Sequence, residues 1–189
     1  MVRRPEGSPL GGQAHHERII PQSSPNGQSG MKQISASQLD ELAKAAQVSP
    51  RRRANLNLHA TLSDPVQRLA IAMEPDTLIR PHRHPHTWEL LYPLRGRFVV
   101  LYFDDAGMVT GRSVLGEETA VLETAAGQWH AVLSLDTGGV IFEVKHGPYR
   151  PIADEDFTRW DSSDGDLQAN ALLHWYASAR PGDRFIEFQ

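Results

Sequence analysis

Short apolar runs separated by turn signals constrain the fold most strongly between residues 55 and 150. The runs are rich in β-branched, aromatic and leucine residues and recur at about 8–12-residue spacing. They are VQRLAIAM, WELLYPL, FVVLYF, SVLG, AVLE, HAVLSL and VIFEVK. Turn-forming residues such as Arg95-Gly96 and Ala126-Gly127 lie between them. This pattern is typical of sandwiches and barrels, so we predict an all-β domain.

Helical segments are predicted on both sides of the β region. Ser37, followed by Asp40, has the pattern of a helix N-cap, and apolar residues then recur at helical spacing, which predicts a helix over about 38–47. Ser49-Pro50 ends it. Near the other end of the chain, DLQANALLHWYAS predicts a helix that docks on the β region. Its docking residues are Leu167, Leu172, Trp175 and Tyr176.

The chain divides into four predicted parts. Residues 1–30 are rich in Gly, Pro, Ser and Gln and are expected to be a disordered leader before Met31. Residues 31–50 form the N-terminal helical segment, 51–152 the barrel, and 153–189 a C-terminal helix and tail packed on the barrel. We expect the tail beyond Asp183 to be mobile.

Composition excludes several classes of function. The 189 residues, 21.0 kDa, suit one domain. Because 19 basic and 23 acidic residues are mixed along the chain, no basic stripe is available to bind nucleic acid. Without cysteine, disulfides and thiolate-ligated metals are impossible. No apolar segment reaches the roughly 18 residues that span a membrane, so we expect no membrane association and a cytoplasmic protein.

A histidine cluster is the strongest candidate for a functional site. His82 and His84 are two residues apart, so they share one side of a strand, and Glu89 and His130 can join them from other strands. Three imidazoles and one carboxylate suit one divalent transition metal such as Mn, Fe, Co, Ni, Cu or Zn. Alternatively, the cluster is an exposed polar turn. His86 is also two residues from His84, so the spacing equally allows His84 and His86 to be the pair of ligands.

Other polar residues on the predicted strands have two interpretations each. Arg68 and Arg80 can bind a carboxylate or phosphate of a substrate, or they can be solvated or salt-bridged on an outer face. Glu143 and Lys145 share a face; we favour an outward surface pair over acid–base groups in the lumen. The alternating polar run RRRANLNLH either lines the approach to the metal or is an edge strand in water.

Two motifs resemble those of the cupin superfamily. HRHPHTWELLYPLRG resembles its first motif, His-x-His, three or four residues, Glu, six residues and Gly, and GQWH resembles the end of its second. The chain departs from the pattern at Asp76, Ala125 and Ser134, which are turn and barrel-wall positions. The segments RRRANLNLH, DPVQRLAIAMEPDT, YFDDAGMV and FEVKHGPYRP make residues 31–178 similar to the WbuC-type cupins of bacterial polysaccharide gene clusters.

The resemblance implies a fold, a metal site and a range of functions. The fold is a cupin-type double-stranded β-helix, a jelly-roll barrel, usually a homodimer. The metal ligands are His82, His84, Glu89 and His130, and His86 becomes a residue of the barrel mouth that joins Arg68, Arg80 and Lys145 as candidates for substrate binding. The metal would polarise a carbonyl or activate water or dioxygen.

We expect either an isomerase/epimerase-like or oxygenase-like enzyme, acting on an oxygen-rich molecule such as a sugar of O-antigen lipopolysaccharide, or a non-catalytic binding or sensing protein.

Overall fold

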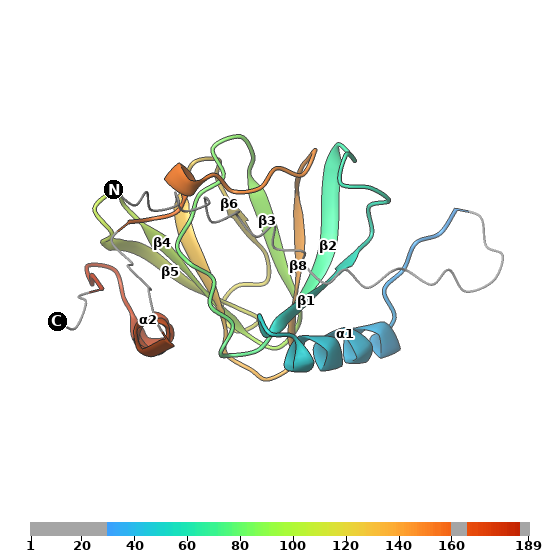
Figure 1. Cartoon of the computed structure of the whole chain (residues 1–189), viewed down its shortest axis with the longest axis horizontal. Coiled ribbons are helices and arrows are strands. Elements are labelled where there is room, and N and C mark those ends of the chain that lie inside the picture. Colours follow the sequence, from blue (N-terminus) through green and yellow to red (C-terminus); the bar gives the residue numbers. More distant parts are fainter. Residues whose placement is uncertain (1–29, 160–165, 186–189) are drawn as a thin grey trace, which may run out of the picture.

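The computed structural model describes residues 30–159 and 166–185, and the side chains of residues 166 and 167 are not part of that description. The predicted leader therefore lies almost entirely outside the described residues, as do residues 186–189 and the side chain of Leu167. Figure 1 shows the described part as two β-sheets with one helix against each. No helix in these ranges is long and apolar enough to cross a membrane.

Eight strands in the described part form two antiparallel sheets. One sheet has the order β1-β2-β8-β3-β6 and the other has the order β5-β4-β7. The strands are β1 (Arg53–Asn57), β2 (Val66–Met73), β3 (Glu89–Arg95), β4 (Phe98–Phe103), β5 (Val109–Leu115), β6 (Leu122–Thr124), β7 (Trp129–Ser134) and β8 (Gly139–His146). Between β3 and β4, Gly96 adopts φ 74°, a left-handed conformation that suits glycine.

The strands pair in the nested order of a jelly roll. β2 pairs with β8, His82 bridges His130 of β7, β3 pairs with β6, and β4 pairs with β5, all antiparallel. The earlier half of the chain thus folds back on the later half from the outermost strands inward, which is the double Greek key of a jelly roll. The prediction of an all-β jelly roll with a short N-terminal helix and a C-terminal helix is confirmed.

The N-terminal helix α1 spans Ala36–Val48 and begins earlier than predicted. Its N-cap is Ser35, not Ser37: the Ser35 hydroxyl accepts from Gln38 N–H, and the Gln38 side chain accepts from Ser35 N–H. This capping box satisfies two backbone donors at once, whereas the Ser37 hydroxyl lies 2.9 Å from that of Ser35. The predicted end at Ser49 is correct.

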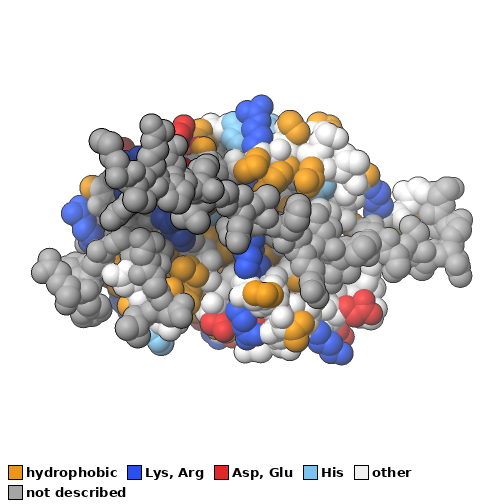
Figure 2. All heavy atoms as spheres, viewed as in Figure 1, with side chains coloured by type: hydrophobic (Ala, Val, Ile, Leu, Met, Phe, Trp, Pro, Cys, Tyr) orange, Lys and Arg blue, Asp and Glu red, His pale blue; other side chains and the backbone are white. Residues whose placement is uncertain are grey.

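Each helix covers the outer face of one sheet. Leu42 and Ala46 of α1 pack on Ala54 and Ala70, on the outer face of the five-stranded sheet. The C-terminal helix α2 (Asp166–Ser178) has the predicted bounds, and its Leu172 and Tyr176 are buried against the other sheet. A separate cluster, which includes Leu91 and Val132, fills the space between the sheets. In Figure 2, Lys and Arg side chains are scattered over the visible face.

Candidate metal centre

His82 and His130 are held opposite each other by the backbone. His82 N–H donates to His130 O at 3.0 Å, and His130 N–H donates to His82 O at 2.9 Å. Opposed residues of an antiparallel pair direct their side chains to the same face. Val132, two residues after His130, packs in the cluster between the sheets, so both imidazoles face the lumen. Their ring centroids are 4.5 Å apart.

The same type of backbone contact orients both rings. His82 Nδ1 lies 2.8 Å from Arg80 O, and His130 Nδ1 lies 3.0 Å from Gln128 O. A ring nitrogen that donates to a carbonyl leaves the opposite nitrogen, Nε2, with its lone pair free. His130 Nε2 is buried and has no hydrogen-bond partner of good geometry among the described residues. Such an atom fits a metal ligand.

His84 completes a compact group of three histidines. One potential ligand atom from each of His82, His84 and His130 lies within 4.8 Å of the other two. All three residues are buried, with exposed fractions of 8%, 7% and 1%. The group can therefore bind a metal, and the interpretation as an exposed polar turn does not hold.

Glu89 of β3 contacts two of these histidines. Its Oε2 lies 3.2 Å from His130 Nε2, and its Oε1 lies 3.6 Å from His84 Nε2. The carboxylate is 4% exposed. Its Oε1 also lies 3.4 Å from Lys145 Nζ, so one oxygen faces the ammonium group while the other faces His130.

Burial and charge prepare these groups for a cation. Burial lowers the pKa of His82 well below its usual value, and it lowers the pKa of His84 to about 4. Burial alone would lower the pKa of His130, but the Glu89 carboxylate outweighs it and raises that pKa. Burial would raise the pKa of Glu89; Lys145 and His130 together hold it well below its usual value. At neutral pH the site therefore offers the Glu89 carboxylate and the neutral imidazoles of His82 and His84, which suit a divalent metal.

Glu143 and Lys145 face the lumen, so the favoured prediction of an outward pair is wrong. Lys145 Nζ lies 2.8 Å from Glu143 Oε1, and the two side chains are 17% and 10% exposed. Their strand, β8, lies beside β3, where Lys145 is the ladder partner of Glu89. Burial, and secondarily the Glu89 carboxylate, raises the pKa of Glu143 to about 7. The two ion pairs of Lys145 raise its pKa although burial opposes this.

Three other candidate residues do not join the histidines. Arg68 forms an ion pair with Asp64 at 3.0 Å, which agrees with the salt-bridged alternative. The Arg80 guanidinium donates to Thr158 O and stacks over Phe157 at 5.2 Å from the ring centroid. His86 is exposed, and its ring centroid is 6.5 Å from that of His84.

The pattern of the sequence did not reveal two further contacts of the centre. Phe157 bridges His82 through the backbone, and its ring centroid lies 6.1 Å from the imidazole. The Tyr102 hydroxyl lies 3.1 Å from Thr124 Oγ1, and Thr124 is the ladder partner of Glu89. Phe157 stands in none of the quoted motifs and the segment YFDDAGMV assigns Tyr102 no role, so only the fold brings the two residues to the site.

Comparisons with known proteins add likenesses of fold. A family described as Domain of unknown function (DUF6016) matches residues 34–115. Comparison with curated proteins gave no match. The jelly-roll assignment rests on the strand pairing of this chain, and the WbuC-type resemblance stays a prediction.

Three solved structures illustrate the likeness. KdgF from Halomonas sp. is 14% identical with a TM-score of 0.43, over 55% of this chain and 85% of that one. The Schizosaccharomyces pombe Cnp3 cupin domain is 11% identical with a TM-score of 0.40, over 51% and 64%. A mutant of Bacillus subtilis oxalate decarboxylase OxdC is 17% identical with a TM-score of 0.42, over 65% and 33%.

Proposed function

We propose that this protein is a metal-dependent cupin enzyme that acts on a small oxygen-rich molecule. The observation that carries the proposal is the group of three buried histidines, each with a potential ligand atom within 4.8 Å of the other two, in which backbone carbonyls orient the rings of His82 and His130. His82, His84 and His130 would hold one divalent transition metal, and Glu89 would be its fourth ligand. When bound, such a metal supplies Lewis acidity to an oxygen atom of the substrate.

The charged residues beside the histidines support an enzyme rather than a non-catalytic binding protein. Glu143 has a pKa of about 7, in the range where a carboxyl group can both take up and release a proton at neutral pH. Lys145, between Glu143 and Glu89, holds both carboxylates near the site. Glu143 is thus the residue best placed to exchange a proton with a substrate.

We further propose a sugar or sugar derivative of bacterial surface polysaccharide, the O-antigen, as the substrate. The segments that resemble WbuC-type cupins support it, because those proteins are associated with polysaccharide gene clusters. Tight binding of a ligand that is never converted would favour a sensing protein.

Metal analysis of the purified protein tests the proposed centre. We expect about one transition metal per wild-type chain and a content well below one for His84→Ala, because this change removes one of three buried nitrogen ligands. The matched control is His86→Ala, which removes an exposed imidazole two residues away and should leave the metal content unchanged. Equal metal content in wild type and His84→Ala would exclude the proposed centre.

A further inference from the structure

The inner side of β1 carries a row of polar residues. Ala54 and Leu56 pack in the cluster under α1, so Asn55 and Asn57 face the opposite side, between the sheets. His59 lies two residues beyond the end of β1, and its Nδ1 contacts the backbone of Arg68 in β2. Asn55 and His59 are 3% and 5% exposed, so this row is not the solvated edge that was one interpretation of the sequence.

Three atoms of this row lack hydrogen bonds. Asn55 Oδ1, Asn57 Oδ1 and His59 Nε2 are buried, and none has a partner among the described residues. A buried polar atom without a partner costs about 1–3 kcal/mol, and native proteins contain few of them. Three in one row therefore indicate a place where a ligand supplies the missing partners.

The row is suited to hydroxyl groups rather than to ions. The two asparagine oxygens are acceptors. His59 Nδ1 lies 3.0 Å from both the backbone nitrogen and the carbonyl oxygen of Arg68, so it can accept from the first or donate to the second. When Nδ1 donates, Nε2 is an acceptor, and when Nδ1 accepts, Nε2 is a donor. Burial lowers the pKa of His59, which keeps the ring neutral. A hydroxyl group both donates and accepts, so it can satisfy each of these atoms.

An apolar surface lies directly beside the polar row. Leu69 and Ile71 of β2 are the ladder partners of Asn57 and Asn55. They face inward, because the alternate residues Ala70 and Ala72 pack under α1. Both side chains are only half-buried, so part of each apolar surface stays accessible, although Ile71 also packs on the cluster between the sheets. Polar atoms beside an accessible apolar surface match a sugar ring, which has hydroxyl groups on its rim and C–H groups on its faces.

We propose that the inner face of β1 and β2 is a subsite for one neutral sugar ring. The hydroxyl groups of the ring bind Asn55, Asn57 and His59, and its C–H face packs on Leu69 and Ile71. This inference assigns residues to the binding of the proposed sugar substrate. It rests on the proposed function, because the reacting part of the substrate would lie at the metal centre and not in this subsite. β8, with Glu143 and Lys145, lies two strands from β1, about 10 Å at the usual strand spacing. A ring bound here thus places the rest of the substrate at the metal centre.

Ligand-observed NMR titration tests the subsite in wild type, Asn55→Leu and Asn57→Leu. The probes are D-glucose, D-galactose, D-mannose and L-rhamnose, with cyclohexanol as an apolar probe and inorganic phosphate as an anion. We expect at least one sugar to bind wild type, and its Kd to rise at least tenfold in either variant. Asn170→Leu, at an exposed position on α2, is the matched control and should bind as wild type does.

Thermal unfolding of the same proteins excludes a trivial loss of folding. Asn55→Leu should unfold at the wild-type temperature or above it, because the substitution removes a buried acceptor without a partner. The subsite is refuted if no sugar binds wild type at about 50 mM, a concentration that would reveal even a Kd in the millimolar range. It is also refuted if both variants bind sugar as wild type does. Each titration is run on metal-loaded and on metal-free protein. Metal analysis shows separately whether the proposed metal centre fails, so that failure is not mistaken for failure of the subsite.

Discussion

Glu143 and Lys145 show where single residues escape prediction from the sequence. Alternation correctly places them on one face with Ile141, which is 1% exposed. The other face of β8 is also apolar, because Val140 lies under α1. With both faces of the strand covered, polarity does not tell which face lines the lumen. The histidines are easier to predict, because the spacing of His82 and His84 is itself a ligand pattern.

The pKa of Glu143 predicts how stability depends on pH in metal-free protein. Its folded pKa of about 7 exceeds the ordinary value of 4.5, so folding favours the protonated form. The contribution of this group to stability is therefore fully present below about 4.5 and is lost as the pH rises through about 7. Glu143→Gln mimics the protonated carboxyl group and should raise the free energy of unfolding at pH 8 by about 1–3 kcal/mol, with a much smaller effect at pH 5.

Urea unfolding of chelator-treated protein at these two pH values checks this expectation. Glu117→Gln is the control, because Glu117 is a surface carboxylate that is 57% exposed and pairs with Arg97. A Glu143→Gln variant that is less stable than wild type at pH 8 would show that the folded protein needs the ionised carboxylate.

At the scale of elements, the start of α1 depends on which serine finds a partner. Ser35 and Ser37 both precede the helical pattern, but only Ser35 has a glutamine three residues later, and the capping box forms there. The prediction placed the cap at Ser37 and its acidic partner at Asp40, which is two residues too far along the chain. The bounds of α2 needed no such choice, because its sequence pattern agrees with its tertiary contacts.

Serine substitutions test the assignment of the cap. Ser35→Ala removes the hydroxyl that accepts from Gln38 N–H and should lower the free energy of unfolding by about 1 kcal/mol. Ser37→Ala, the neighbouring control, should lower it by less than about 0.5 kcal/mol. Denaturant unfolding measures both, and a larger loss for Ser37→Ala would contradict the capping box.

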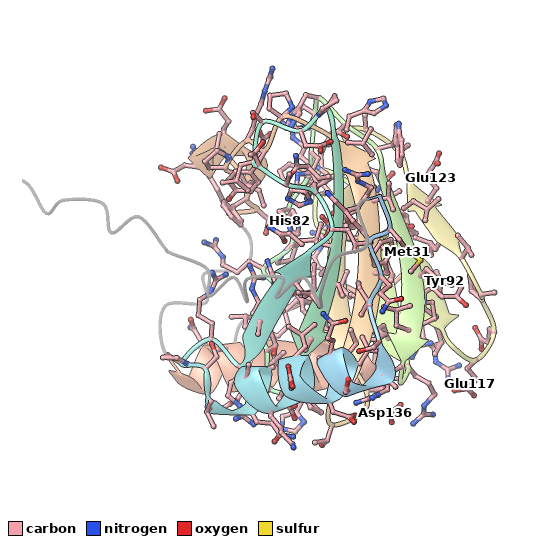
Figure 3. The ribbon with its side chains drawn as sticks, turned by 90° about the vertical axis from the view of Figure 1, so that its right-hand side faces the viewer. Met31, His82, Tyr92, Glu117, Glu123 and Asp136 are labelled. Carbon is pink, nitrogen blue, oxygen red and sulfur yellow. The ribbon has the colours of Figure 1, made fainter. Side chains whose placement is uncertain are left out.

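At the scale of the whole molecule, the outer face of the five-stranded sheet carries an exposed apolar surface. Tyr92 and Leu94 of β3 are 44% and 36% exposed. Figure 3 shows Tyr92 on the side of the molecule that also carries Glu123, away from His82. We propose this surface as the contact of the homodimer that the cupin resemblance implies, because apolar residues of this kind are enriched at interfaces.

Sedimentation of the purified protein tests the dimer. We expect a mass of twice the 21.0 kDa chain for wild type and a shift toward the monomer for Tyr92→Lys, which places a charge in the contact. Asn170→Lys introduces the same charge at an exposed position of α2, which lies against the other sheet, and serves as the control. A wild-type mass of one chain at high concentration would contradict the dimer.

The sequence by itself determined the class of fold and the residues of the histidine group. Alternation, turns and the two histidine motifs are local patterns, and a strand or turn follows largely from its own residues. Only the tertiary structure decided which side of each strand lines the lumen, because α1 and α2 bury the outer faces too and remove the polarity difference between the two sides. For that reason the lumen positions of Glu143, Lys145 and the β1 row followed from the packing alone.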